Sequence, residues 1–240
     1  MSRSGASLEA ILAATAGIRG RSGDRNYALE GATRSFAFES SRFTRIAAAY
    51  LARTISNDKI VKILKKLAES GMIEAESFAS SSANELIDLL AEAKLALAIP
   101  AAKMLVTLAV WYVGLCENHP NAIEETSTDR LRESLIAIKG LGAATADAIL
   151  LFGVDRPAYP VDRSTWRVFI RHGYLDSSVD YDEARSTIES LAPDDPARLA
   201  ALSITLEAIG REFCKPAVAA CEACPLAPLL PERGPYEIDT

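Results

Sequence analysis

A chain of 240 residues with 49% hydrophobic residues is long enough to form one domain or two small ones around a buried core. No apolar run approaches the roughly 20 residues that a membrane-spanning helix needs, and the N-terminus carries no convincing cleavable signal. We therefore expect a soluble, intracellular protein with no membrane partner. The net charge of −6 argues, on its own, against a nucleic-acid partner.

The charge is unevenly distributed along the chain. Residues 1–66 carry twelve Lys and Arg against five Asp and Glu, about +7, which leaves about −13 for the remainder. A local basic surface on an acidic chain is compatible with DNA binding, because a patch makes the phosphate contacts. Ordinary solvated helix faces would give the same numbers, so charge leaves both interpretations open.

Apolar residues repeat at helical spacing along almost the whole chain, without a sustained alternating strand pattern. Gly, Ser and charged residues over 20–40 predict a loop or irregular arm. Candidate helix caps are Ser7, Asn57 or Asp58, Ser82 or Asn84, and Ser127, while Pro100 opens the most apolar helix. The sequence thus predicts an all-α fold of about ten helices. The expected ranges include 7–18, 43–54, 57–71, 84–93, 101–116, 127–138, 165–172, 181–191 and 196–213.

The stretch "IKGLGAATADAIL" predicts a helix, a hairpin and a second helix over 135–151. Gly140 and Gly142 lie where a reversal between helices needs positive φ or close backbone approach. Glycines would also leave backbone N–H groups uncovered at the positive end of the second helix, which suits a phosphate oxygen. A glycine-rich turn in any helical protein is the alternative. The residues expected on the buried face are Leu141, Ala146, Ile149 and Leu150.

The full hairpin pattern, together with "GVDRPAYPVDRSTWRV" after it, resembles the endonuclease III superfamily of DNA glycosylases, also called HhH-GPD. A weaker resemblance extends over 43–226. It implies a two-lobed helix-hairpin-helix glycosylase fold. One lobe would be a six-helix barrel, residues 35–156, ending in the hairpin at 132–152. The other would combine 1–34 with 157–240, with double-stranded DNA bound between the lobes of a monomer.

Asp162 has two interpretations that do not exclude each other. From the residues alone, it caps the helix that begins at Arg163, since Asp is a preferred capping residue. The resemblance implies that it is also the catalytic carboxylate, which activates water and stabilises positive charge on the sugar. The resemblance places the DNA-binding residues in the hairpin and beside this acid. They are Lys139, Gly140, Leu141, Gly142, Ala144, Thr145 and Arg163.

The lyase nucleophile of the superfamily's bifunctional members is missing. Its lysine would stand at Ala144, eighteen residues before Asp162, and alanine cannot form a Schiff base. The sequence therefore predicts a monofunctional base-excision glycosylase that leaves the strand uncut. A displaced lysine, such as Lys103, would make it a bifunctional glycosylase and AP lyase. A non-catalytic DNA-binding protein that uses the hairpin as a clamp is the third alternative.

The identity of the excised base is not encoded in a recognisable motif. The superfamily's glutamine near the flipped base is replaced by Thr54 at about its place in "RTISND". Aromatic side chains could line a base pocket, although at helical spacing each one is more typical of a core. These candidates are Tyr50, Trp111, Tyr112 and Trp166.

Three of the four cysteines crowd into eleven residues, as Cys214, Cys221 and Cys224. The spacing C-x6-C-x2-C suits a metal site and resembles the superfamily's 4Fe–4S loop through its third ligand. The fourth position is Leu230, so the last ligand could be solvent, Glu232 or another oxygen. The alternative is a metal-free packed loop, and in either case we expect an architectural role.

Overall fold

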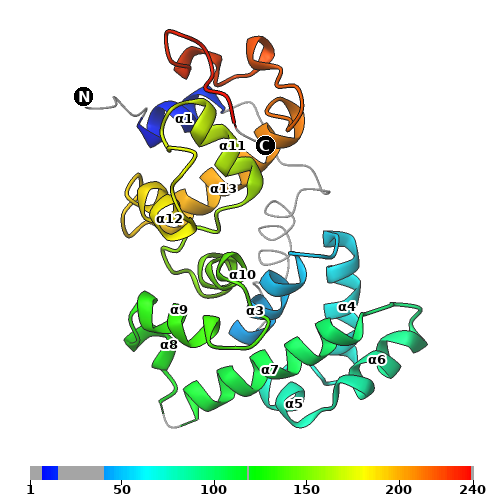
Figure 1. The fold of residues 1–240 in the computed structure, drawn as a ribbon. Coiled ribbons are helices and arrows are strands. Elements are labelled where there is room, and N and C mark those ends of the chain that lie inside the picture. Colours follow the sequence, from blue (N-terminus) through cyan, green and yellow to red (C-terminus); the bar gives the residue numbers. More distant parts are fainter. Residues whose placement is uncertain (1–6, 16–40, 118, 239–240) are drawn as a thin grey trace.

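The computed structural model describes residues 7–15, 41–117 and 119–238, and every regular element in these ranges is a helix (Figure 1). The predicted all-α class is therefore confirmed for the described chain. In chain order the elements are α1 (Leu8–Ala14), α3 (Arg42–Leu51), α4 (Asn57–Glu69), α5 (Ala75–Ser80), α6 (Ala83–Glu92), α7 (Ile99–Cys116), α8 (Ala122–Glu125), α9 (Thr128–Ile136), α10 (Ala143–Ala148), the π-helical turn η1 (Ile149–Gly153), α11 (Arg163–Arg171), α12 (Tyr181–Glu189), α13 (Pro196–Glu212), and the 3-10 turns η2 (Cys221–Ala223) and η3 (Ala227–Leu229).

The helices form two groups, which we call the lower and upper groups after their places in Figure 1. The lower group runs from α3 to η1, and the upper group holds α1 with α11, α12 and α13. Contacts between α13 and η1 join the groups. The two-lobed class is confirmed, whereas the exact lobe boundaries at 35–156 and 157–240 stay a prediction.

The long helix α7 organises the lower group, where it contacts α3, α5, α6 and α8. Ala102, Leu105 and Leu108 recur at helical spacing and are each at most 1% exposed. By length and composition alone α7 would also be able to cross a membrane, which we did not expect from the sequence. Its contacts with four neighbouring helices bury one face of α7, whereas Ile99 and Val110 on the helix are each 54% exposed.

Most predicted helices agree with the structure to within a few residues. Ser7, Ser82 and Ser127 are N-caps whose side chains accept backbone hydrogen bonds, as predicted. The helix at 57–69 is capped by Ser56 instead of the predicted Asn57 or Asp58. The short helices α5 and α8 were not predicted, because six and four residues are too few to show a period. The expected loop at 20–40 lies outside the described residues.

In the upper group, α11 and α13 approach each other at Gly210. A Cβ atom added there would lie 2.3 Å from both Cβ and Oγ of Ser164, on the first turn of α11. No such contact occurs in real structures, so only glycine permits this spacing. The close approach fixes the start of α11, and with it the position of the residue that precedes the helix, Asp162.

We predict that Gly210→Ala lowers the free energy of unfolding by about 1–3 kcal/mol, because the added methyl group pushes α11 away from α13. Thermal or denaturant unfolding measures the loss. Gly114→Ala is the matched control, since a Cβ at Gly114 in α7 meets nothing within 4 Å. Equal stability of the two variants would contradict the close approach.

Candidate functional site

The hairpin between α9 and α10 depends on the conformation of Gly140. Its φ of +93° is one that residues with side chains rarely adopt, so the glycine is required by the backbone. A Cβ there would stand 3.5 Å from Cε of Met104, in ordinary contact. The prediction of a glycine with positive φ is thus confirmed at Gly140.

Gly142 differs from Gly140 in its backbone conformation and in what surrounds an added Cβ atom. It is the N-cap of α10 with φ −77° and ψ 158°, an extended conformation that any residue adopts. A Cβ there would meet nothing within 4 Å, so the chain itself does not require a glycine. Within the described residues, the N–H groups of Gly142, Ala143 and Ala144 donate to no acceptor, and these three residues are at least partly exposed. Three consecutive free amides at a helix start suit an anion.

The other hairpin residues divide into a buried and an exposed set. Leu141 is 4% exposed, which confirms that it points inward. Ala146, Ile149 and Leu150 are fully buried, as predicted for the packing face. Lys139 is exposed beside Gly140, and Thr145 and Ala144 are partly exposed. The exposed edge of the hairpin therefore carries the free amides and one lysine.

Asp162 is the N-cap of α11. Its Oδ1 accepts a hydrogen bond from the backbone N–H of Thr165 at 2.8 Å, which confirms the capping interpretation. The side chain is partly exposed, and its Oδ2 makes no hydrogen bond within the described part of the chain. Arg163, the next residue, is exposed. One carboxylate oxygen thus fixes the helix start while the other remains available.

The loop before Asp162 is tied to the lower group at its beginning. The guanidinium of Arg156 donates to three backbone carbonyls at the end of α8, those of Ile123, Glu124 and Thr126. Asp155 has a φ of +55°, a strained conformation for a residue with a side chain, and accepts a hydrogen bond from Arg45 of α3. These contacts hold the beginning of the loop in a single conformation, although its backbone is irregular.

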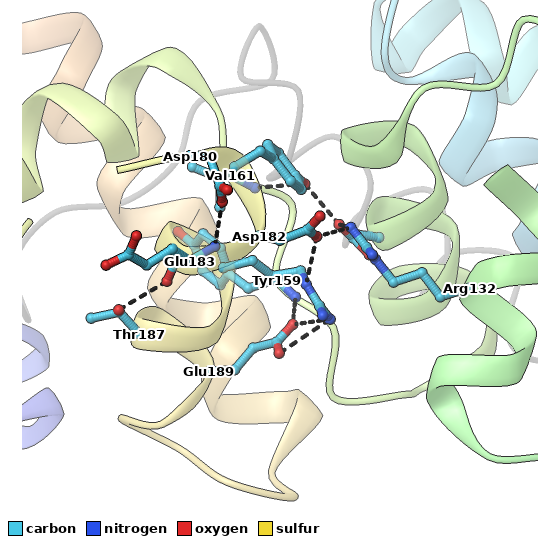
Figure 2. Close-up of polar contacts among 11 residues, drawn as sticks. Arg132, Tyr159, Val161, Asp180, Asp182, Glu183, Thr187 and Glu189 are labelled. Carbon is cyan, nitrogen blue, oxygen red and sulfur yellow. Dashed lines mark hydrogen bonds and ion pairs between the residues drawn. The ribbon is translucent and has the colours of Figure 1, made fainter. Parts of the chain in front are cut away.

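The same loop is tied to α12 at its end. Prolines at 157 and 160 fix φ and lack an N–H, so few loop amides need partners. The N–H of Tyr159 donates to Oε1 of Glu189 at 2.8 Å, and the N–H of Val161 donates to the hydroxyl of Tyr181 at 3.3 Å (Figure 2). Helix α12 therefore supplies a side chain to each of these two amides.

Tyr181 also connects α12 to the hairpin. Its hydroxyl donates to Oδ2 of Asp147 in α10 at 2.8 Å, and Oδ1 of Asp147 accepts from Nε of Arg132 in α9 at 2.7 Å. Arg132 reaches Asp182 of α12 at 2.7 Å as well, so the network closes across both groups (Figure 2). Asp147 is fully buried, which makes this a buried ion pair.

Burial raises the pKa of the Asp147 carboxyl above its ordinary value, and the hydrogen bonds from Arg132 and Tyr181 act against that rise. Burial, followed by the neighbouring carboxylate of Asp147, also raises the pKa of Tyr181. The hydroxyl therefore keeps the proton that it donates, and a guanidinium at hydrogen-bond distance favours the ionised carboxylate.

The sequence analysis did not identify the residues of this network. The available signal was Asp147 itself, a lone acid inside the apolar stretch "ATADAILLF". A charge on a buried helix face requires partners, so an arginine nearby in space was to be expected. Its tyrosine partner lies 34 residues further along the chain and only the fold brings it close.

The aromatic candidates for a base pocket lie against the core. Tyr50, Trp111, Tyr112 and Trp166 are partly buried and pack against buried apolar residues. The indole N–H of Trp111 donates to Oγ of Ser134 at 3.0 Å, a contact within the lower group. The packing supports the core interpretation, and these residues stay untested as base contacts.

The three C-terminal cysteines lie around one small cavity. Cys214, Cys221 and Cys224 line it together with Leu230, the residue at the missing fourth position. The cavity measures about 10 Å³, the space of roughly one water molecule. Sγ of Cys214 accepts a hydrogen bond from Arg171 at 3.1 Å, and burial raises the pKa of the Cys224 thiol.

These residues do not fit a four-cysteine cluster. Three thiols meet, but the side chain of Leu230 offers no donor atom at the fourth position. No group of His, Cys, Asp and Glu in the described ranges could hold a single metal ion. Glu232, the oxygen ligand considered from sequence, does not line the cavity. The three cysteines are thus brought together as predicted, but their surroundings lack the fourth ligand that a cluster needs.

No protein-family model matches the chain. A protein of Methanocaldococcus jannaschii that carries the provisional name DNA repair glycosylase is 34% identical over 116 residues, which are 47% of this chain and 52% of that protein. The chain therefore spans about half the length of this curated relative.

Two solved structures share the fold. A thermostable thymine-DNA glycosylase superposes with a TM-score of 0.59 at 18% identity and 92% coverage of each chain. A trapped endonuclease III–DNA covalent intermediate superposes with a TM-score of 0.54 at 21% identity, over 85% of this chain and 92% of the other. The chain therefore shares the fold of these two structures, and it is 34% identical to the endonuclease III of Sulfolobus acidocaldarius over 101 residues, which are 42% of this chain and 44% of that protein.

We predict that the purified protein, expressed with ample iron and handled without oxygen, holds less than one iron per chain and has no broad visible absorption. The physical reason is the apolar fourth position. Leu230→Cys, which completes the thiol set, is the control for loading conditions. A brown wild-type protein with about four iron atoms per chain would contradict the conclusion that Cys214, Cys221 and Cys224 lack a fourth ligand.

Proposed function

We propose that the chain is a monofunctional DNA glycosylase that hydrolyses the N-glycosidic bond of a damaged or mismatched base in duplex DNA, with Asp162 as its catalytic carboxylate. The observation that carries the proposal is a partly exposed acid with one free oxygen, at the end of a loop that hydrogen bonds join to the hairpin helix. The names of the related proteins support the same activity. We infer a monomer acting in the cytoplasm, at the nucleoid.

The chemistry requires one carboxylate and one water molecule. As the bond between C1′ and the base breaks, its electron pair leaves with the base and positive charge develops on the sugar. The negative charge of Asp162 stabilises that cation, and its free Oδ2 can take a proton from the attacking water. The sugar gains a hydroxyl group and the base gains a proton, so no further reactant is needed.

The hairpin would hold the DNA backbone. The free amides of Gly142, Ala143 and Ala144 offer three donors to a phosphate oxygen, and exposed Lys139 adds a positive charge beside them. Arg163 stands exposed next to the catalytic acid, where it can contact a phosphate near the extruded nucleotide. The position of the bifunctional enzymes' lysine is occupied by Ala144, which has no amine, so we expect an intact abasic strand as the product.

We predict that Gly142→Ala weakens the affinity for duplex DNA roughly tenfold while changing the free energy of unfolding by less than about 0.5 kcal/mol. The added methyl group would meet no atom of the chain within 4 Å and would not strain an extended backbone, but it would stand on the residue that carries the first of the three amides. Gly140→Ala should instead lower stability by about 1–2 kcal/mol, because of its positive φ. Affinity is measured by titration at fixed salt, with Gly114→Ala as the control. Unchanged affinity of the Gly142 variant would count against phosphate binding at these amides.

We predict that Asp162→Asn slows base release at least about 100-fold without a marked loss of stability. Asparagine caps a helix about as well as aspartate, so the variant separates the catalytic role from the capping role. The assay is a panel of duplexes, each with one lesion or mismatch, incubated with either protein and analysed with and without alkali. Strand cleavage should appear only after alkali.

Two outcomes of this assay favour the other candidate functions. Nicking without alkali, with a protein–DNA adduct trapped by borohydride, identifies a lyase that uses a displaced lysine such as Lys103. Binding of every duplex with no base release, unaffected by Asp162→Asn, identifies a non-catalytic clamp. A thermal unfolding curve for each variant confirms that the compared proteins are folded.

A further inference from the structure

We propose that Asp147, Arg132 and Tyr181 are positioning residues that set the loop carrying Asp162 relative to the hairpin, so that the phosphate site and the acid act as one unit. The inference rests on the proposed function and adds to it a set of residues that touch neither the DNA backbone nor the reacting atoms. Arg132 and Asp147 lie within the hairpin segment 132–152, where neither had an expected role, and Tyr181 lies outside it.

The path from the hairpin to the acid has four steps. Arg132 of α9 donates to Oδ1 of Asp147 in α10 at 2.7 Å. Oδ2 of Asp147 accepts from the Tyr181 hydroxyl at 2.8 Å, and that hydroxyl oxygen accepts from the N–H of Val161 at 3.3 Å (Figure 2). The residue after Val161 is Asp162. A single hydroxyl group therefore links the hairpin helix to the backbone beside the carboxylate.

Stability alone does not explain a charged network at this place. Asp147 is fully buried and the Arg132 side chain is 12% exposed, so both ions have lost most of their hydration. Apolar residues of similar volume are often as stable as a buried ion pair, or more so. What the ion pair provides is a defined geometry, because the guanidinium and the hydroxyl accept only a narrow range of directions. Precise placement of a loop is the property that catalysis needs.

Tyr181 is the residue at which this role can be separated from folding. Glu189 holds the N–H of Tyr159 at 2.8 Å through a different residue of α12, so the loop keeps that tie when the hydroxyl is removed. Arg132 keeps its bond to Asp147 and its ion pair with Asp182. Tyr181→Phe thus removes the link to Val161 and leaves most of the network in place.

The experiment compares wild type, Tyr181→Phe and Asp147→Asn, with Tyr174→Phe as the matched control. The Tyr174 hydroxyl donates to the carbonyl of Leu229 at 3.4 Å, in the C-terminal segment. For each protein we would measure the single-turnover rate of base release, the Kd for the same duplex, and the amide hydrogen exchange of Val161 by NMR.

We expect Tyr181→Phe to slow base release about 10- to 100-fold, with Kd unchanged within about twofold. The amide of Val161 should exchange at least about fivefold faster, because it has lost its acceptor. Asp147→Asn should slow base release in the same way, since the hydroxyl of Tyr181 loses its charged partner. Tyr174→Phe should resemble wild type in all three measurements.

Unchanged exchange at Val161 in Tyr181→Phe would overturn the proposal, whether or not the protein is active. Faster exchange with an unchanged rate of base release would overturn it as well, because the loop would then be held without consequence for the chemistry. If wild type releases no base from any duplex, the proposed function fails. The exchange measurement still decides in that case whether the hydroxyl holds the loop.

Discussion

The buried carboxylate of Asp147 is the constraint around which the candidate site is organised. It lies in the second helix of the hairpin, with no exposed surface, and it accepts hydrogen bonds from α9 on one side and α12 on the other. A buried charge has to be satisfied, so the relative placing of these three helices is limited to arrangements that bring an arginine and a hydroxyl to it. This requirement therefore sets the position of the hairpin relative to the loop that carries Asp162.

The two hairpin glycines have different roles in the turn. Gly140 is needed by the backbone, since its φ is positive, whereas Gly142 is extended and faces open space. A glycine that the fold does not need, next to amides without acceptors, is what the proposed phosphate site at the hairpin requires. Asp162 divides its two oxygens in the same manner, one for the start of α11 and one free. The atoms that hold the fold are thus different from the atoms that are proposed to act on the DNA.

Much of the fold and part of the site could be predicted from the sequence, for physical reasons. Local periodicity and capping chemistry are encoded within a few residues, which is why the helices, the turn at Gly140, the inward Leu141 and the cap at Asp162 agree with the structure. The roles of Tyr181 and Glu189 could not be predicted, because their partners lie about 20 to 34 residues away and depend on how α12 packs. The convergence of three cysteines with Leu230 on a cavity that admits about one water likewise depends on tertiary packing.

The two helix groups differ in how their members are distributed along the chain. The lower group is continuous from α3 to η1, whereas the upper group joins α1 to α13, with Ile11 buried and Glu9 paired with Arg198. Such a distant contact forms late, since a long segment has to be ordered before its ends can meet. During synthesis on the ribosome, the lower group can therefore fold first, while the α1 segment has to wait for α13 to emerge. The loop of Asp162, which is tied to α3, α8 and α12, can be held before that closure, because none of these ties involves α1.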